Sequence, residues 1–167
     1  MKREKKDMSS NRKVLSLVFV FRGDEVLLGM KKRGFGSGRW NGFGGKFDPS
    51  VDRTVLDCAV RETREECGLE LRDVREIGVL EFTFDPKYER RAMEVHVFWT
   101  DAFGGEPRET EEMRPQWFDC HRVPFEQMWP DDPLWYPYLL RREPFDGRIV
   151  FSDFDTILSH SVRPRTT

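Results

Sequence analysis

Apolar and polar residues follow one another along the chain in a pattern that predicts a mostly stranded protein. An apolar run over 14–21 and a shorter one over 25–30 flank the turn Arg22-Gly23-Asp24, which is typical of a β-hairpin. Further runs predict strands over 76–84, 93–100, 116–119, 148–151 and 156–160. A helix is predicted over 53–67, and a shorter one from 132 to about 140. Strands that outnumber the helices packed on them indicate an α+β (mixed α/β) fold, a mixed β-sheet flanked by helices.

Both predicted helices carry recognisable end signals. Gly68 follows the first helix, as glycine commonly does at a helix C-terminus. The second helix is predicted to have Asp132 as its N-cap and Pro133 as its first residue. Apolar residues at helical spacing predict the buried face of the first helix, which comprises Val55, Leu56, Ala59 and Val60.

Length and charge limit the classes of function. The chain has 167 residues, which suits a single domain; we place it at 13–167, after a flexible basic tail over 1–12. Its formal net charge is −2, so no overall field draws it to nucleic acid polymers or to anionic membranes. The longest apolar run covers 14–21 and is too short to cross a bilayer. We therefore expect a monomer with neither a membrane nor a nucleic acid polymer as its partner.

The cysteines indicate the compartment. The chain has 3 of them, Cys58, Cys67 and Cys120, and they form no C-x-x-C pair. An odd and scattered set is typical of a reducing environment. We therefore expect a cytoplasmic protein, with nuclear and mitochondrial pools left open.

The segment RETREECGL over 61–69 gathers acidic residues where helix physics favours basic ones. Glu62, Glu65 and Glu66 share one helical ridge at spacings i, i+3 and i+4, and the last turn already carries partial negative charge. Each conflict costs at most about 1 kcal/mol, so a solvated acidic face is one interpretation. A divalent cation is the other, because Mg²⁺ prefers carboxylate oxygens. The glycine-rich loop over 34–45 would let backbone approach such a ligand closely.

These residues and the preceding Gly44-Gly45 resemble the Nudix box, G-x5-E-x7-R-E-U-x-E-E-x-G-U, in which U is aliphatic. Other segments, VLLGMKKRGFGSGRWNGFGGK, MEVHVF, EMRPQWF, PFEQMWPDDPLW and DTIL, are similar to the animal MutT homologues of the Nudix hydrolase family. The similarity covers 14 to about 160. It implies the Nudix fold, hydrolysis of a nucleoside diphosphate linked to another group, and Mg²⁺ as the cofactor, with Mn²⁺ as a substitute.

The resemblance also implies roles for the box residues. Arg61 would orient the glutamates, which bind the metal or activate water. Any of the glutamates could be the general base, because a metal ligand and a proton acceptor look the same in a sequence. The implied metal-side residues are the backbone carbonyl of Gly44 and the side chains of Glu62, Glu65, Glu66 and Glu112.

The box departs from the family pattern. Arg53 stands where the pattern has its upstream glutamate, and Phe47 stands where it has its leading glycine. Gly45 lies two residues before that place, which indicates a two-residue insertion within 46–52. Thr63 replaces an aliphatic residue, a modest change in packing. We expect the chemistry to survive, because the missing glutamate usually supports the site rather than binding the metal.

The segment Trp129-Pro130-Asp131-Asp132 is a second candidate site. A capping role explains Asp132 but not Asp131. Adjacent carboxyl groups in an apolar pocket cannot both ionise easily, so one keeps its proton and can donate to a purine edge while the other accepts. By resemblance, this pair reads one edge of the base, Asn41 reads the other, and Trp129 stacks on the ring. The resemblance adds Phe35, Phe82 and Met93 around the base and Lys31 near the sugar.

The remaining candidates are interpreted as structural. Phe84 and Phe98 are predicted to belong to the core, and His96 to be a packed or half-exposed imidazole. No Ser-His-Asp or Cys-His arrangement can be assembled from the motifs, which argues against covalent catalysis.

By resemblance, the activity is hydrolysis of oxidised purine nucleoside triphosphates, of the 8-oxo-dGTP and 2-hydroxy-dATP type, to the monophosphate and pyrophosphate. Such an activity would sanitise the nucleotide pool and prevent DNA damage. One alternative is a Nudix hydrolase with shifted substrates, such as methylated purine triphosphates or other nucleoside diphosphate derivatives. The other is a non-catalytic nucleotide-binding protein. Loss of Glu65 or Glu66 would have favoured the latter, and both are present.

Overall fold

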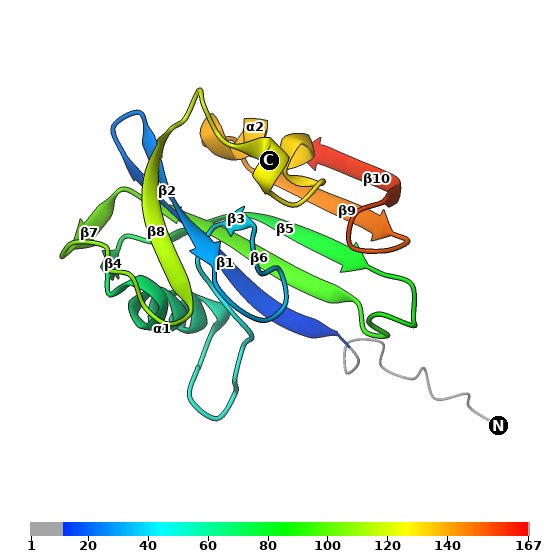
Figure 1. The fold of residues 1–167 in the computed structure, drawn as a ribbon, viewed down its shortest axis with the longest axis horizontal. Coiled ribbons are helices and arrows are strands. Elements are labelled where there is room, and N and C mark those ends of the chain that lie inside the picture. The colour runs from blue at the N-terminus through cyan, green and yellow to red at the C-terminus, as the bar shows by residue number, and fades with distance from the viewer. Residues whose placement is uncertain (1–11, 167) are drawn as a thin grey trace.

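The computed structural model of the protein describes residues 12–166 (Figure 1). Its strands are β1 (Lys13–Arg22), β2 (Glu25–Lys31), β3 (Trp40–Asn41), β4 (Glu70–Arg72), β5 (Arg75–Thr83), β6 (Met93–Thr100), β7 (Ala102–Gly104), β8 (Met113–Asp119), β9 (Phe145–Phe151) and β10 (Ile157–Pro164). Its helices are α1 (Val55–Cys67), the short 3-10 helix η2 (Phe125–Gln127) and α2 (Asp132–Leu140). Of the tail predicted over 1–12, all but Arg12 lies outside the described residues.

Eight of the described strands form one sheet. Its order is β10-β9-β5-β6-β1-β2-β3, and β8 pairs with β2 outside this path, while β4 and β7 form a separate pair. β1 is parallel to β6 and β5 is parallel to β9, whereas β1–β2, β5–β6 and β9–β10 are antiparallel. α1 lies along one side of the sheet, and α2 lies on the other side beside β9 and β10 (Figure 1). The mixed sheet with its flanking helices confirms the predicted α+β class.

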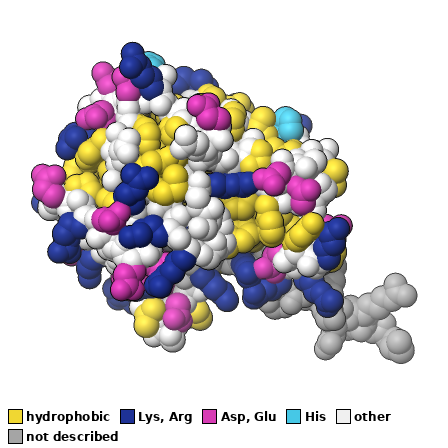
Figure 2. Space-filling model, in the orientation of Figure 1, with side chains coloured by type: hydrophobic (Ala, Val, Ile, Leu, Met, Phe, Trp, Pro, Cys, Tyr) yellow, Lys and Arg dark blue, Asp and Glu magenta, His cyan; other side chains and the backbone are white. Residues whose placement is uncertain are grey.

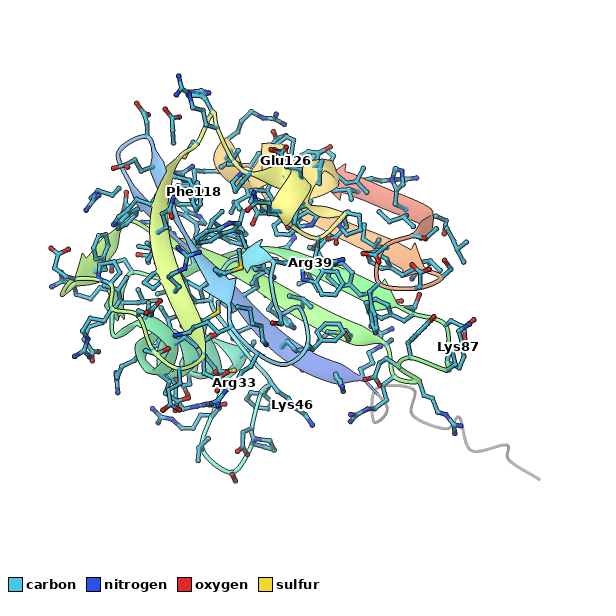
Figure 3. The ribbon with its side chains drawn as sticks, in the orientation of Figure 1. Arg33, Arg39, Lys46, Lys87, Phe118 and Glu126 are labelled. Atoms are coloured by element: carbon cyan, nitrogen blue, oxygen red, sulfur yellow. The ribbon has the colours of Figure 1, made fainter. Side chains whose placement is uncertain are left out.

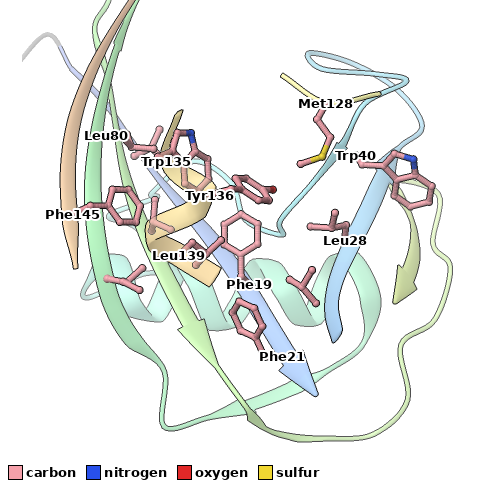
Figure 4. Close-up of a cluster of buried hydrophobic side chains, with 14 residues drawn as sticks. Phe19, Phe21, Leu28, Trp40, Leu80, Met128, Trp135, Tyr136, Leu139 and Phe145 are labelled. Carbon is pink, nitrogen blue, oxygen red and sulfur yellow. The ribbon is translucent and has the colours of Figure 1, made fainter. Parts of the chain in front are cut away.

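The two faces of β1 belong to two hydrophobic cores. Val18 and Val20 pack with residues of α1, whereas Phe19 and Phe21 pack with residues of α2. Because successive side chains of a strand point to opposite faces, a strand covered on both sides reads as the continuous apolar run seen in the sequence. On the α2 side, the ring centroids of Trp135 and Tyr136 lie 5.8 and 5.3 Å from that of Phe19 (Figure 4).

Local hydrogen bonds set the ends of α1. The helix begins at Val55 rather than at 53, because Thr54 caps it. Thr54 Oγ1 accepts from the Asp57 N–H at 3.1 Å, and the Asp57 carboxylate accepts from the Thr54 N–H at 3.2 Å, which is a capping box. At the other end Gly68 adopts φ 80°, the left-handed conformation that favours glycine. The predicted C-terminus is confirmed.

The predicted buried face of α1 is wrong in part. Leu56 is 40% exposed, and Val55 and Val60 are only partly buried. The buried stripe instead runs through Ala59, Thr63 and Glu66, at i, i+4 and i+7, with Cys58 and Cys67 beside it. Small side chains allow the helix to approach β1 closely, and the Thr63 hydroxyl is satisfied by donating to the Ala59 carbonyl at 2.8 Å.

The predicted longer strands are confirmed, but β3, β4 and β7 were not predicted. Each has only two or three residues, which is too few to reveal a period of two. No helix within residues 12–166 combines the length and the apolarity that a bilayer span requires.

Candidate functional site

A cavity of about 180 Å³ opens between the sheet, the β2–β3 loop and the start of α2. Figure 2 shows the molecule in the orientation of Figure 1, and apolar side chains are exposed there in patches between charged side chains. The cavity is lined by every residue predicted to bind the base or sugar, namely Lys31, Phe35, Asn41, Phe82, Met93, Trp129, Asp131 and Asp132. Gly44 and Glu66, which were predicted on the metal side, line it too. The two candidate sites therefore meet in one cavity.

The three glutamates of α1 differ in their exposure to solvent. Glu66 is 9% exposed, and its Oε1 accepts from the Gly44 N–H at 2.7 Å. Burial and the nearby charge of Glu62 raise the pKa of Glu66 to about 8, although the Gly44 hydrogen bond opposes this. Burial also raises the pKa of Glu62, against the effect of Arg61. Only Glu65, with its side chain 58% exposed, fits the interpretation of a solvated acidic face.

The glycines before α1 allow this close packing. A Cβ on Gly44 would lie 1.9 Å from the Ser16 carbonyl oxygen, so no other residue fits there. A Cβ on Gly45 would lie 2.5 Å from Cδ of Glu62. The carboxylate of Glu62 therefore rests directly on the backbone of the glycine-rich loop.

Arg61 lies among the carboxylates, as predicted. Its Nη1 donates to Glu62 at 3.0 Å and approaches Glu65 at 3.4 Å. Its strongest partner, Asp52, was not predicted. Nε of Arg61 donates to Oδ1 of Asp52 and Nη2 donates to Oδ2, each at 2.8 Å. These hydrogen bonds from Arg61 lower the pKa of Asp52 to about 2. The signal in the sequence was an acid next to Arg53, at the end of the inserted loop.

The donor set has the chemistry of a site for a hard divalent cation. Burial raises the pKa of Glu62 and Glu66, so their carboxylates lack compensating charge when they are ionised. Carboxylate oxygens are the ligands that a hard divalent cation prefers. In this structure no three His, Cys, Asp or Glu side chains within 12–166 converge on one point. Glu112 in particular is engaged elsewhere: Arg33 donates to its Oε1 at 2.5 and 3.0 Å, and it does not line the cavity.

The acidic pair at the other end of the cavity is deeply buried. Asp131 and Asp132 are each 2% exposed. Asp131 Oδ2 accepts from the Trp135 indole N–H at 2.8 Å, whereas Asp132 Oδ2 has no hydrogen-bond partner among the described residues. Burial raises the pKa of Asp131 to about 6, and burial together with the charge of Asp131 raises that of Asp132 well above its usual range. One of the two carboxyl groups therefore carries a proton near neutral pH.

The predicted capping role of Asp132 is wrong. Asp131 occupies the N-cap position, Asp132 is the first helical residue, and the Asp131 side chain makes no capping hydrogen bond. Pro133 follows within the first turn, where its missing N–H costs nothing. Capping therefore accounts for neither carboxyl group, and both residues line the cavity.

Aromatic rings form the walls around the acidic pair. The ring centroids of Phe35 and Trp129 are 5.1 Å apart, and Phe84 stacks on Phe151 at 5.0 Å. Phe98 is buried in the core as predicted, but the prediction for Phe84 is wrong because Phe84 lines the cavity. Phe84 directly follows β5 and lies two residues after Phe82, on the same face of the strand, and both rings line the cavity.

Arg39 is a cavity residue that sequence reasoning missed. Its guanidinium lies 4.3 Å from the Trp129 ring centroid, in the geometry of a cation–π contact. It also donates to the Phe154 carbonyl at 3.1 Å and pairs with Asp155. Arg39 thereby ties the β9–β10 loop to the β2–β3 loop across Trp129 (Figure 3). Its position between Gly38 and Trp40 in the glycine-rich loop was the available signal.

Asn41 and His96 are two further polar residues considered in the sequence, and only Asn41 lines the cavity. Asn41 Oδ1 accepts from the Gly42 N–H at 2.8 Å, which fixes the amide at the cavity wall. His96 is half-buried, as predicted, between Glu76 at 2.5 Å and Glu94 at 2.9 Å. Burial opposes its charged form, but the hydrogen bonds to both glutamates raise the pKa of His96. It does not line the cavity.

Comparison with known proteins agrees with this geometry. The profile of the NUDIX domain matches residues 11–139. The chain is 49% identical over 156 residues to the oxidized purine nucleoside triphosphate hydrolase of Mus musculus, covering 93% of this chain and 97% of that protein. It is 47% identical to the protein of the same name from Danio rerio, covering 90% and 94%. The crystal structure of a MutT protein from Bacillus halodurans superposes with a TM-score of 0.79 at 22% identity, over 92% of this chain and 99% of that one, and so supports the fold. The chain therefore belongs to the NUDIX domain family and is an enzyme of that family, a hydrolase.

Proposed function

We propose that this enzyme hydrolyses oxidised purine nucleoside triphosphates to the nucleoside monophosphate and pyrophosphate, with Mg²⁺ as its metal. The name of the mouse and zebrafish relatives supports the substrate class, and their similarity spans nearly the whole chain. The observation that carries the proposal is the buried pair Asp131 and Asp132, with the unpartnered Asp132 Oδ2, in an aromatic cavity that reaches Glu66.

The acidic pair suits an oxidised purine because its proton can change place. With the proton on one carboxyl group, the pair donates to the base from that side and accepts from it on the other. Moving the proton exchanges the two roles, so one cavity serves both an 8-oxoguanine and a 2-hydroxyadenine edge. Trp129 supplies a π-face for the ring, and Asn41 is positioned to bond its opposite edge. Phe35, Phe82 and Met93 surround the base, and Lys31 lies at the sugar side.

The phosphates would lie toward the acidic end of α1. Hydrolases of this family generally use divalent metal ions, and Glu62, Glu65, Glu66 and the Gly44 carbonyl would hold the ion here. When bound, Mg²⁺ neutralises charge on the phosphates and helps to orient a water. A glutamate of α1 would take the proton of that water.

We also propose that the enzyme acts as a monomer on free nucleotides in the cytoplasm. All the residues predicted to bind the base or sugar line one cavity without a residue from a second copy. The described cysteines Cys58, Cys67 and Cys120 are free thiols, which suits a reducing compartment.

A turnover screen with Mg²⁺ tests the proposal. Normal, oxidised and methylated deoxynucleoside triphosphates are offered, and the release of pyrophosphate and of orthophosphate is measured separately. We expect oxidised purine triphosphates to have the highest kcat/KM and pyrophosphate to be the product. A preference for methylated purines would transfer the proposal to that substrate class, and orthophosphate as the product would refute the cleavage site.

A further inference from the structure

Asp52 and Arg61 form a bidentate ion pair. Two parallel hydrogen bonds of 2.8 Å join the guanidinium edge to both carboxylate oxygens, the bidentate arrangement that fixes an arginine most firmly. The Asp52 side chain is 1% exposed and that of Arg61 is 26% exposed. The third guanidinium nitrogen, Nη1, lies 3.0 Å from the Glu62 carboxylate and 3.4 Å from that of Glu65. The orientation of Arg61 therefore determines what the two glutamates contact.

The inserted loop holds Asp52 in place. The Asp52 N–H donates to the Asp48 carbonyl at 2.7 Å, and the Asp48 N–H donates back to Asp52 Oδ2 at 3.0 Å. Ser50 donates to Asp48 Oδ1 through its N–H at 2.9 Å and its hydroxyl at 2.6 Å. The loop is thus closed on itself around the carboxylate, which faces α1.

Arg53, which occupies the place of the family's upstream glutamate, has no comparable role. Its side chain is 93% exposed, and within residues 12–166 its one ion pair, with Asp57, spans 3.8 Å. An exposed pair at that distance contributes little. Asp52, one residue before Arg53, is the carboxylate that pairs with Arg61.

We propose that Asp52 is a positioning residue for catalysis, which acts through Arg61 to hold Glu62 and Glu65 in the arrangement that binds the metal. In this chain the carboxylate that pairs with Arg61 comes from the end of the inserted loop over 46–52. The turnover assay of this proposal rests on the proposed function, because it needs a substrate that the enzyme hydrolyses. The metal-binding assay does not depend on the proposed function.

Asp52→Asn tests the proposal, with Asp48→Asn as the matched control. Both changes remove one negative charge from the same loop, but the Asp48 side chain makes no contact with Arg61, and an asparagine oxygen can still accept from Ser50. We expect Asp52→Asn to lower kcat by about 10- to 100-fold, as loss of a supporting partner of metal ligands commonly does, and to change the KM for nucleotide by less than about 3-fold. Binding of Mn²⁺ to the metal-free protein without nucleotide, followed by water-proton relaxation, should weaken at least about tenfold. Asp48→Asn should stay near the parent in both assays.

A double-mutant cycle shows whether Asp52 acts through Arg61. In the Arg61→Gln background, Asp52→Asn should have no further effect on kcat or on Mn²⁺ binding, because the residue it positions is absent. Independent, additive losses would overturn the proposal, and so would an Asp52→Asn variant that matches Asp48→Asn. Should Asp52→Asn fail to fold, the cycle is run with Asp52→Glu, which keeps the charge on a longer side chain. If the parent hydrolyses no purine triphosphate, the proposed function fails, whereas Mn²⁺ binding still decides the role of Asp52.

Discussion

Replacing Asp131 by asparagine should make the stability of the protein less dependent on pH. Asp131 is 2% exposed, and burial raises its pKa from the usual 3.8 to about 6. The folded state therefore binds this proton more tightly than the unfolded state does. The resulting stability is fully present below about pH 4 and is lost as the pH rises through about 6.

The size of this effect follows from the pKa. A rise from 3.8 to about 6 corresponds to about 3 kcal/mol of unfolding free energy. Asparagine has no proton to lose, and its Oδ1 can still accept from the Trp135 indole, which lies 2.8 Å from Asp131 Oδ2. The unfolding free energy of the variant minus that of the parent should therefore increase by about 3 kcal/mol between pH 3 and pH 8.

Urea unfolding at a series of pH values, in the presence of a chelator, measures this difference. Asp24→Asn is the control, because Asp24 is exposed in the β1–β2 turn. Its difference from the parent should vary little over the same range. A difference for Asp131→Asn that stays constant with pH would show that the carboxyl group is not buried in its protonated form, and would refute the reasoning.

Three further predictions concern the acidic end of α1. Glu65→Gln should abolish turnover while nucleotide binding, measured by calorimetry, persists; unchanged turnover would remove this residue from the mechanism. Gly45→Ala should lower kcat at least about tenfold, because the added Cβ would lie 2.5 Å from Cδ of Glu62. Gly104→Ala is the control and should leave kcat unchanged, because no atom lies within 4 Å of a Cβ added there. A chelator should stop turnover and Mg²⁺ should restore it; activity that survives complete removal of metal would contradict the role assigned to the glutamates.

The sequence predicted the main elements because their patterns are long. The run over 14–21 and the segment 93–100 gave β1 and β6 almost to the residue, since strands covered by a core carry many apolar side chains. The face of α1 was misjudged for a physical reason: its buried side includes the polar residues Thr63 and Glu66, so apolarity alone did not identify it. Leu56 matched the helical spacing and yet lies in solvent.

The candidate site was predicted where residue types imply chemistry and missed where partners decide it. Asp131 and Trp129 were recognisable because a capping role left them unexplained. Asp52 was not recognisable, because an insertion hides which acid faces Arg61 until the loop is folded. Glu112 was predicted on the metal side from the resemblance, but in this structure Arg33 donates to its carboxylate and Glu112 does not line the cavity.

The measurement that most directly tests base recognition by the acidic pair is the ratio of kcat/KM for 8-oxo-dGTP to that for 2-hydroxy-dATP, in the parent and in Asp132→Asn. Asparagine cannot exchange a proton with Asp131, so it locks the pair in one arrangement. The parent should hydrolyse both nucleotides, and the variant should keep one and lose the other, with a change in the ratio of at least about tenfold, the effect of one hydrogen bond. Mn²⁺ binding should be unchanged. An unaltered ratio would contradict recognition by a shared proton.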